Sequence, residues 1–190
     1  MDPRSQLIDL IISKSYREGD FTLSSGQKSS FYIDLKATTL SAQGADLIGR
    51  LSIESLSRTG LLSKVDGVGG LTLGADPVAT AISLASLQRV PDGIPAFIVR
   101  KEPKGHGTAR FIEGIDNLRP AGSLLVVEDV STTGASAFAA VQRVQEAGFD
   151  VLAVLTVVDR EQGADQFFKE QKVPFLSLVK LSDLKLRYRG

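Results

Sequence analysis

Two adjacent carboxylates followed by a run of hydroxyls are the residues of this chain with the clearest chemical potential. Glu128 and Asp129 come directly after the apolar run 124–127, which is typical of a buried strand in a parallel sheet. Ser-Thr-Thr-Gly follows at 131–134, and apolar residues then recur at helical spacing until Gly148. The pattern predicts a strand, an acidic pair, a hydroxyl-rich turn and a helix N-terminus, in that order.

This order favours a phosphorylated sugar as ligand. Ligands of open α/β sheets bind beyond the carboxyl ends of the strands, and a helix N-terminus there offers unpaired N–H groups that suit a phosphate. Carboxylates would repel the phosphate, so they suit sugar hydroxyls or a metal ion instead. We expect the phosphate on the turn 131–136 and the sugar diol on Glu128 and Asp129. An ordinary strand-to-helix turn with a threonine as N-cap remains the alternative at this point.

A second cluster is basic. Arg100, Lys101, Lys104 and His106 lie within seven residues, directly after the predicted strand 96–99. The intervening proline and glycines indicate a loop. A solvated surface loop would explain the pattern, but the cluster contains the one histidine of a chain whose 22 basic and 22 acidic residues cancel.

The composition limits the classes of function. A formal net charge of zero gives no global field for nucleic acid or an anionic membrane, so we expect neither as partner. Without cysteine there are no disulfides or thiolate sites. The N-terminus lacks the pattern of a signal peptide, and no apolar run approaches the ~20 residues of a membrane span. We expect one soluble, cytoplasmic domain covering residues 1–190.

The remaining pattern predicts an α/β fold. Helices are expected near 7–12, at 44–57, around Phe167 and Phe168, and in the tail 182–190; a hairpin is expected from 21–23 and 31–35; further strands are expected at 65–68, 151–158 and 175–179. A glycine-rich turn at 67–77 predicts a second anion-binding nest, with Asp76 as cap of the next helix. Arg160 follows the strand 151–158 and so is expected on the ligand side of the sheet.

These motifs resemble those of a known family. The apolar run, Glu-Asp-Val and Thr-Thr-Gly at 124–134 look like the phosphoribosyl diphosphate (PRPP) motif of type I phosphoribosyltransferases. The segment 19–36 resembles the N-terminal hood of orotate phosphoribosyltransferases, and Arg-Lys-x-x-Lys-x-His-Gly at 100–107 resembles their flexible loop. The resemblance implies a central, mainly parallel sheet flanked by helices, a hood at about 1–40 and a flexible catalytic loop at about 101–114.

The resemblance also implies a reaction and its residues. The 5-phosphoribosyl group would pass from PRPP to orotate, giving orotidine 5′-monophosphate and pyrophosphate in pyrimidine biosynthesis, with Mg²⁺ held mainly by the substrate and no fixed protein metal site. The catalytic residues would be Lys104, His106 and Asp129. The PRPP-binding residues would be Arg100, Lys101, Lys104, His106, Glu128, Asp129, Val130, Ser131, Thr132, Thr133, Gly134, Ala135 and Ser136. The orotate-binding residues would be Tyr32, Ile33, Thr132 and Arg160.

The resemblance has further implications for the glycine-rich turn, the loop and the hood, and it leaves two alternative functions open. The glycine-rich turn would hold pyrophosphate, often through an unusual backbone geometry. The loop would close over the active site of the neighbouring subunit, which implies a homodimer. Ser24 stands where the family often has a lysine, so we predict no substrate contact by a hood lysine there. A purine-type phosphoribosyltransferase and a non-catalytic PRPP-sensing regulator are the alternatives, since both would share the 124–139 unit.

Overall fold

A six-stranded sheet forms the centre of the computed structural model, which describes residues 2–22, 28–103 and 111–189. Its strand order is β5-β4-β3-β6-β7-β8, and all neighbouring strands are parallel except β5 against β4. The strands are β3 (Gly67–Leu71), β4 (Ala96–Val99), β5 (Ile112–Glu113), β6 (Ser123–Ser131), β7 (Asp150–Asp159) and β8 (Phe175–Lys180). This confirms the predicted α/β fold with a mainly parallel sheet.

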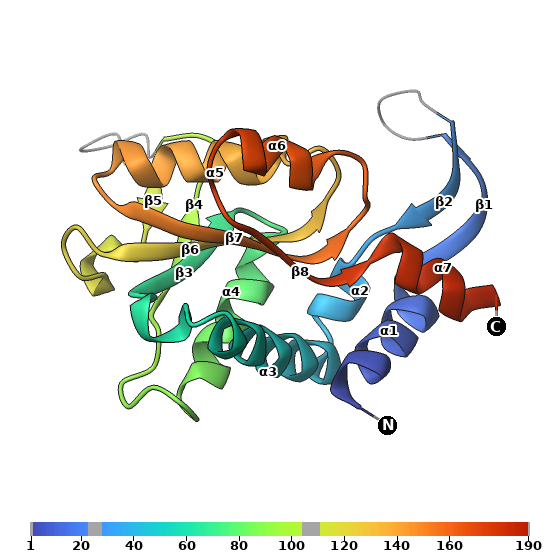
Figure 1. The fold of residues 1–190 in the computed structure, drawn as a ribbon, viewed down its shortest axis with the longest axis horizontal. Helices are drawn as coiled ribbons and strands as arrows, with labels where there is room; N and C mark the ends of the chain where they lie inside the picture. The colour runs from blue at the N-terminus through green and yellow to red at the C-terminus, as the bar shows by residue number, and fades with distance from the viewer. Residues whose placement is uncertain (1, 23–27, 104–110, 190) are drawn as a thin grey trace.

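Helices cover both faces of the sheet, which explains why its central strands read as continuous apolar runs. Helices α5 (Ala135–Glu146) and α6 (Ala164–Glu170) lie on one face, and α3 (Ala42–Arg58) and α4 (Ala75–Ser86) lie on the other (Figure 1). Each face has its own apolar cluster. Side chains of β6 alternate between the two clusters: Leu125 and Val127 pack on the α3 side, and Leu124 and Val126 on the α5 side. Two short 3₁₀ turns, Leu62–Lys64 and Ile115–Asn117, complete these connections.

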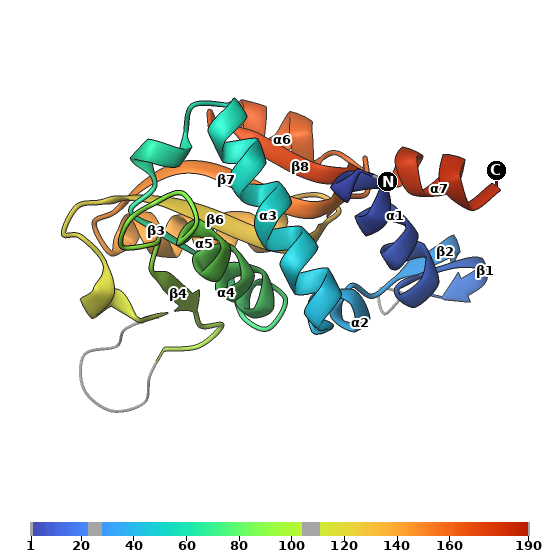
Figure 2. The ribbon, with the colours of Figure 1, turned by 90° about the horizontal axis from the view of Figure 1, so that it is seen from below.

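A smaller layer, the hood, lies beside the sheet at the end where β8 runs into the last helix (Figures 1 and 2). It consists of α1 (Pro3–Lys14), the antiparallel strands β1 (Tyr16–Thr22) and β2 (Lys28–Ile33), the single turn α2 (Lys36–Thr39) and the C-terminal helix α7 (Leu181–Arg189). Arg187 in α7 makes two hydrogen bonds to the carboxylate of Asp9 in α1, at 2.7 and 3.0 Å. Both ends of the chain therefore contribute to one layer.

The hood and the predicted loop each differ in extent from the sequence expectation. The predicted hairpin is present, but its first strand begins at Tyr16, five residues before the predicted start. Its turn, with Ser24, lies outside the described residues. Within the predicted loop 101–114, Ile112–Glu113 form the edge strand β5, paired with Val99 and Ile98. The strand predicted at 96–99 is confirmed with the same bounds.

The glycine-rich segment 67–77 begins as a strand, and its turn starts only after Leu71. The prediction of a short strand 65–68 followed by a turn is wrong in its boundary, since β3 spans Gly67–Leu71. Close packing explains the glycines: a Cβ on Gly69 would lie 2.2 Å from the Phe97 carbonyl oxygen, and one on Gly70 would lie 2.1 Å from that of Val127. Glycine here permits close backbone approach inside the sheet.

Asp76 is not the cap of α4. The N-cap is Gly74, and Asp76 lies in the first helical turn, where its carboxylate accepts a hydrogen bond from the Thr72 hydroxyl at 2.7 Å. The peptide bond between Thr72 and Leu73 is cis. The segment 72–76 joins β3 to α4, with Gly74 and Asp76 at the start of the helix.

Candidate active site

The hydroxyl-rich turn joins β6 to α5 at the carboxyl end of the parallel strands. The predicted order, in which the strand ends before the acidic pair and the hydroxyl-rich turn begins at Ser131, is wrong in its boundary, because β6 extends through Ser131, which pairs with Asp159 of β7. Gly134 is the N-cap of α5 and makes no side-chain cap, so the alternative with a threonine as N-cap is also wrong. The turn encloses a pocket of about 70 Å³. Its lining residues are Glu128, Val130, Ser131, Thr132, Thr133, Gly134, Ala135, Ser136 and Ala137.

Only glycine fits the N-cap of α5. Gly134 has φ +88°, in the left-handed region, and a Cβ there would lie 2.8 Å from Cε2 of Phe168. The Phe168 ring is fully buried and stacks on Phe175, so it has little freedom to move away. The conformation of the turn that would hold a phosphate is therefore constrained by the buried Phe168 ring packed against Gly134.

Gly134→Ala is expected to lower the free energy of unfolding by about 2 kcal/mol, since the left-handed conformation alone costs about 1–2 kcal/mol for a residue with a Cβ. It should also raise KM for PRPP at least about tenfold, because the displaced turn no longer presents its N–H groups to the phosphate. Urea unfolding and initial rates measure the two effects. Gly148→Ala is the matched control: Gly148 has φ +86° but nothing within 4 Å of its Cβ position, so stability alone should fall.

Glu128 lies under the turn as a buried carboxylate. Its side chain is 7% exposed, and Oε2 is buried without a hydrogen-bond partner among the described residues. Burial, followed by the neighbouring charge of Asp129, raises the pKa of Glu128 to about 8, while the positive charge of Lys101 acts in the opposite direction. Ser131 Oγ, beside it, is also buried and unpartnered within the described part of the chain. These two atoms are the kind of buried polar groups that a ligand would satisfy.

Asp129 points to the segment between β3 and α4. Its Oδ1 accepts a hydrogen bond from the Val130 N–H at 2.9 Å, and a Cβ on Gly74 would lie 2.5 Å from the same oxygen. The carboxylate of Asp129 also raises the pKa of Lys36, although the hydrogen bond from Lys36 to Asp34 is the larger cause. Lys36 is a basic group near the site that sequence reasoning missed, because only the folded hood brings it toward Asp129.

Arg160 lies next to the turn. Its backbone N–H donates to the Ser131 carbonyl oxygen at 2.9 Å, which fixes it one strand away from the acidic pair. Its guanidinium stacks over the Phe31 ring of the hood, with Cζ 4.9 Å from the ring centroid. Burial lowers the pKa of Arg160, and its Nε is buried without a partner among the described residues. A partly buried guanidinium in this state is suited to bind a carboxylate.

The hood brings the other predicted orotate residues to the same place. Tyr32 and Ile33 directly follow Phe31, the residue whose ring the Arg160 guanidinium contacts, in strand β2. The Tyr32 side chain is 44% exposed and packs against Phe21 at 5.7 Å between ring centroids. Thr132, the residue predicted to touch both substrates, lies in the turn next to Ser131.

The basic cluster is described only in part. Lys101 is exposed, and its charge reaches Glu128. Arg100 is held by residues near it in the chain, with an ion pair of 3.0 Å to Glu113 and a hydrogen bond to the Glu102 carbonyl oxygen. The two other predicted cations, Lys104 and His106, lie outside the described residues.

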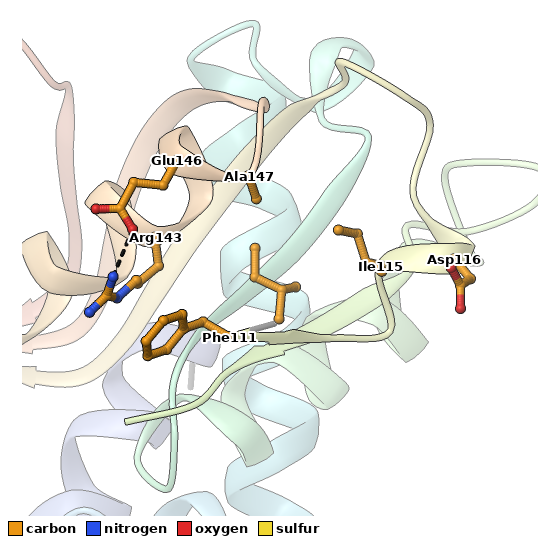
Figure 3. Close-up of a pocket in the computed structure, with 7 residues that line it drawn as sticks. Phe111, Ile115, Asp116, Arg143, Glu146 and Ala147 are labelled. Atoms are coloured by element: carbon orange, nitrogen blue, oxygen red, sulfur yellow. Dashed lines mark hydrogen bonds and ion pairs between the residues drawn. The ribbon is translucent and has the colours of Figure 1, made fainter. Parts of the chain in front are cut away.

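A larger groove of about 540 Å³ lies apart from these residues, between α5 and the segment 111–116 (Figure 3). Arg143 stacks over the Phe111 ring with Cζ 3.7 Å from the centroid, and it forms an ion pair with Glu146. Among the described residues, none of those predicted to bind PRPP or orotate lines this groove. Volume alone therefore does not mark the site in this chain.

The described residues lack a ready-made metal cluster and a membrane-spanning helix. They contain no group of three or more histidine, cysteine, aspartate or glutamate side chains arranged to hold a metal ion. None of their helices has the length and apolar character needed to cross a membrane.

The sheet order, the acidic pair at the end of β6 and the turn into α5 define a type I phosphoribosyltransferase, and solved phosphoribosyltransferases share this fold. No family model matches the chain. A curated orotate phosphoribosyltransferase of Thermosynechococcus vestitus is 50% identical over 97% of this chain and 94% of its own length. The chain belongs to the orotate phosphoribosyltransferase family.

Further relatives agree. The orotate phosphoribosyltransferase of Corynebacterium glutamicum strain R is 47% identical over 98% of this chain and 96% of its own. The crystal structure of the Mycobacterium tuberculosis orotate phosphoribosyltransferase in complex with PRPP matches with a TM-score of 0.76 and 40% identity, over 97% of this chain and 99% of that one. An adenine phosphoribosyltransferase of Leishmania donovani, at 16% identity and a TM-score of 0.68, shares the fold alone.

Proposed function

We propose that this chain transfers the 5-phosphoribosyl group of PRPP to orotate, giving orotidine 5′-monophosphate and pyrophosphate in pyrimidine biosynthesis. The observation that carries the proposal is the junction of three parts: the turn after β6, Arg160 after β7, and the hood strand β2 against Arg160. The turn and acids suit the sugar phosphate, and the arginine suits the carboxylate of orotate. A purine has no carboxylate for Arg160, which disfavours the purine-type alternative.

In this proposal, N–H donors bind the phosphate of PRPP and carboxylates bind its ribose. The 5′-phosphate lies on the N–H groups of 131–136, and Glu128 and Asp129 accept hydrogen bonds from the ribose hydroxyls. Asp129 also favours positive charge on the ribose as the bond to pyrophosphate breaks. The bond from the anomeric carbon to the ring nitrogen of orotate then forms, and the proton of that nitrogen is lost.

Pyrophosphate leaves with several negative charges, more than a helix N-terminus can balance. Arg100, Lys101, Lys104 and His106 are the cations that we assign to it; Lys104 and His106 could also donate a proton to it. Mg²⁺ prefers oxygen donors, which Glu128 and Asp129 offer beside the ribose, and most of its ligands would come from PRPP and water. When bound, the ion neutralises charge on the leaving group.

Purified protein with PRPP, Mg²⁺ and orotate tests the proposal. We expect loss of orotate absorbance with equimolar release of pyrophosphate. Turnover of adenine, guanine or hypoxanthine in place of orotate would contradict it. Binding of PRPP without turnover of any base would favour the PRPP-sensing alternative.

We also propose that the enzyme is a homodimer whose loop 101–114 reaches the neighbouring active site. Three leucines support an interface: Leu73 before α4, and Leu84 and Leu87 near its end, are 71%, 65% and 58% exposed. Exposed apolar side chains of this size, on or next to one helix, are typical of a surface that binds a partner. Leu73 belongs to the glycine-rich segment 67–77, which the family resemblance assigns to pyrophosphate, so an interface there would bring a second subunit close to the site.

Mixing inactive Lys104→Ala and inactive Asp129→Ala proteins is expected to restore activity, to at most about one quarter of the wild-type level, because half of the randomly paired dimers carry one intact site. Rates are measured after subunit exchange has been verified by mass spectrometry. Adding Leu84→Glu to both proteins should abolish the recovery by charging the interface. No recovery in verified mixed dimers would show that each loop serves its own subunit.

A further inference from the structure

The side chain of Phe31 is the physical support of the Arg160 guanidinium. It is 6% exposed, and its ring centroid lies 4.9 Å from Arg160 Cζ and 5.0 Å from Lys185 Nζ. Two cations from different elements, the end of β7 and helix α7, therefore meet one ring of the hood. No carboxylate among the described residues forms an ion pair with Arg160 within 4.0 Å, so the ring replaces the usual acidic partner.

The Phe31 ring is itself held by two tyrosines. Tyr16 in β1 is fully buried and stacks on Phe31 with 6.3 Å between centroids and 24° between planes. Tyr188 in α7 packs its edge against Tyr16 at 5.3 Å. The Tyr16 hydroxyl donates to Glu18 at 2.8 Å, which fixes the ring in its plane. We call Tyr188, Tyr16 and Phe31 the aromatic column.

The column ends at a guanidinium whose Nε has no partner in the described part of the chain. An acidic support would neutralise this group and compete with an incoming carboxylate. An aromatic face instead holds the guanidinium by its quadrupole and leaves its charge and its N–H edge free for a ligand.

We propose that Phe31, backed by Tyr16 and Tyr188, is a positioning residue that orients Arg160 for the carboxylate of orotate and so sets specificity for a pyrimidine that carries an anionic group. The inference rests on the proposed function. It assigns the C-terminal helix α7 a role at the active site that its sequence gives no sign of.

Steady-state kinetics of Phe31→Leu test the inference. KM for orotate should rise roughly 3- to 30-fold, the range that loss of one cation–π contact covers, while KM for PRPP changes less than about twofold. Phe31→Tyr keeps an aromatic face and should restore KM for orotate. Phe149→Leu is the matched control, because it removes a buried phenyl ring from the other face of the sheet, just before the start of β7 and away from Arg160, and should leave both KM values unchanged.

Turnover of orotate by the wild type tests the proposed function, and the KM values of Phe31→Leu test the role of Phe31, which rests on that function. Wild-type turnover of orotate together with an unchanged KM for orotate in Phe31→Leu would overturn the inference and leave the function intact. Equal rises in both KM values would assign Phe31 a merely structural role. If Phe31→Leu does not fold, Tyr188→Leu, which changes the exposed end of the column, should still raise KM for orotate but not KM for PRPP.

Discussion

Arg160→Met is expected to lower kcat/KM for orotate by about 100- to 1000-fold, while KM for PRPP changes less than about threefold. A bidentate pair between a guanidinium and a carboxylate makes two charge-assisted hydrogen bonds, together about 3–4 kcal/mol, and each 1.4 kcal/mol corresponds to about tenfold. The structure supports this size because Arg160 is partly buried and unpaired among the described residues, so the substrate meets a charge that no protein carboxylate neutralises.

The stability of Arg160→Met tests whether its lower activity is caused by loss of folding. A partly buried guanidinium without an acidic partner contributes little to folding, since burying it costs hydration. Arg160→Met should therefore unfold at the same urea concentration as the wild type, or at a higher one. A marked loss of stability would mean that the kinetic effect reflects folding rather than recognition of orotate.

Arg160→Lys distinguishes a planar fork from a simple charge. Lysine keeps the positive charge but cannot make two parallel hydrogen bonds or stack on Phe31 in the same way. We expect it to lose most of the activity that methionine loses. Near-wild-type kinetics in Arg160→Lys would show that the site needs only a charge at this position, and would weaken the specific role of the aromatic column.

Local patterns were sufficient to predict the parts of the site that lie within one strand-turn-helix unit. The acidic pair, the hydroxyl-rich turn and the helix after it are contiguous, so hydrophobic periodicity places them. Arg160 could be placed because a buried apolar run ends two residues before it, at Val158. The same logic failed at β3, where two of the strand's three glycines, Gly69 and Gly70, are required by the backbone of Phe97 and Val127 across the sheet. No local pattern carries that information.

Contacts between distant segments could not be predicted. The column joins Tyr16 and Phe31 to Tyr188, at the other end of the chain, and α7 alone reads as a basic amphipathic tail. Lys36 likewise reads as a surface lysine until the hood folds toward Asp129. Strand β5 is too short to show periodicity and forms because Val99 and Ile98 offer it an edge to pair with. In each case tertiary packing, rather than propensity, decides the structure.

Glu128→Gln is expected to make the free protein more stable at alkaline pH. The pKa of Glu128 is raised from 4.5 to about 8, so the folded protein keeps a proton that the unfolded chain has already lost between these values. Wild-type stability therefore falls as pH rises from about 4.5 to about 8, and the variant, which is neutral in both states, escapes this loss. The gain should be near zero at about pH 4.5 and reach several kcal/mol above about pH 8. Urea unfolding across this range measures it.

Glu146→Gln serves as the matched control for that series. Glu146 forms an exposed pair with Arg143, and exposed pairs contribute about 0–1 kcal/mol, so its substitution should give no gain that grows with pH. A Glu128→Gln variant whose stability follows the wild type at every pH would contradict the buried, protonated carboxyl.

Binding of PRPP should release the proton that Glu128 holds in the free protein. Ribose hydroxyls that donate to Glu128 favour its ionised form, so binding near pH 7 should drive the proton of Glu128 into solvent. Calorimetry with PRPP and Mg²⁺ in buffers of different ionisation enthalpy measures the protons released, and the wild type should release up to about one more than Glu128→Gln. The difference between the two proteins isolates Glu128, because any protonation of the loop cations or of the diphosphate is common to both.

Equal release of protons by both proteins would mean that the ribose does not use the ionised carboxylate of Glu128. In that case the alkaline gain in stability would have no counterpart in binding, and the buried carboxyl of Glu128 would act in its neutral form as a hydrogen-bond donor to the sugar.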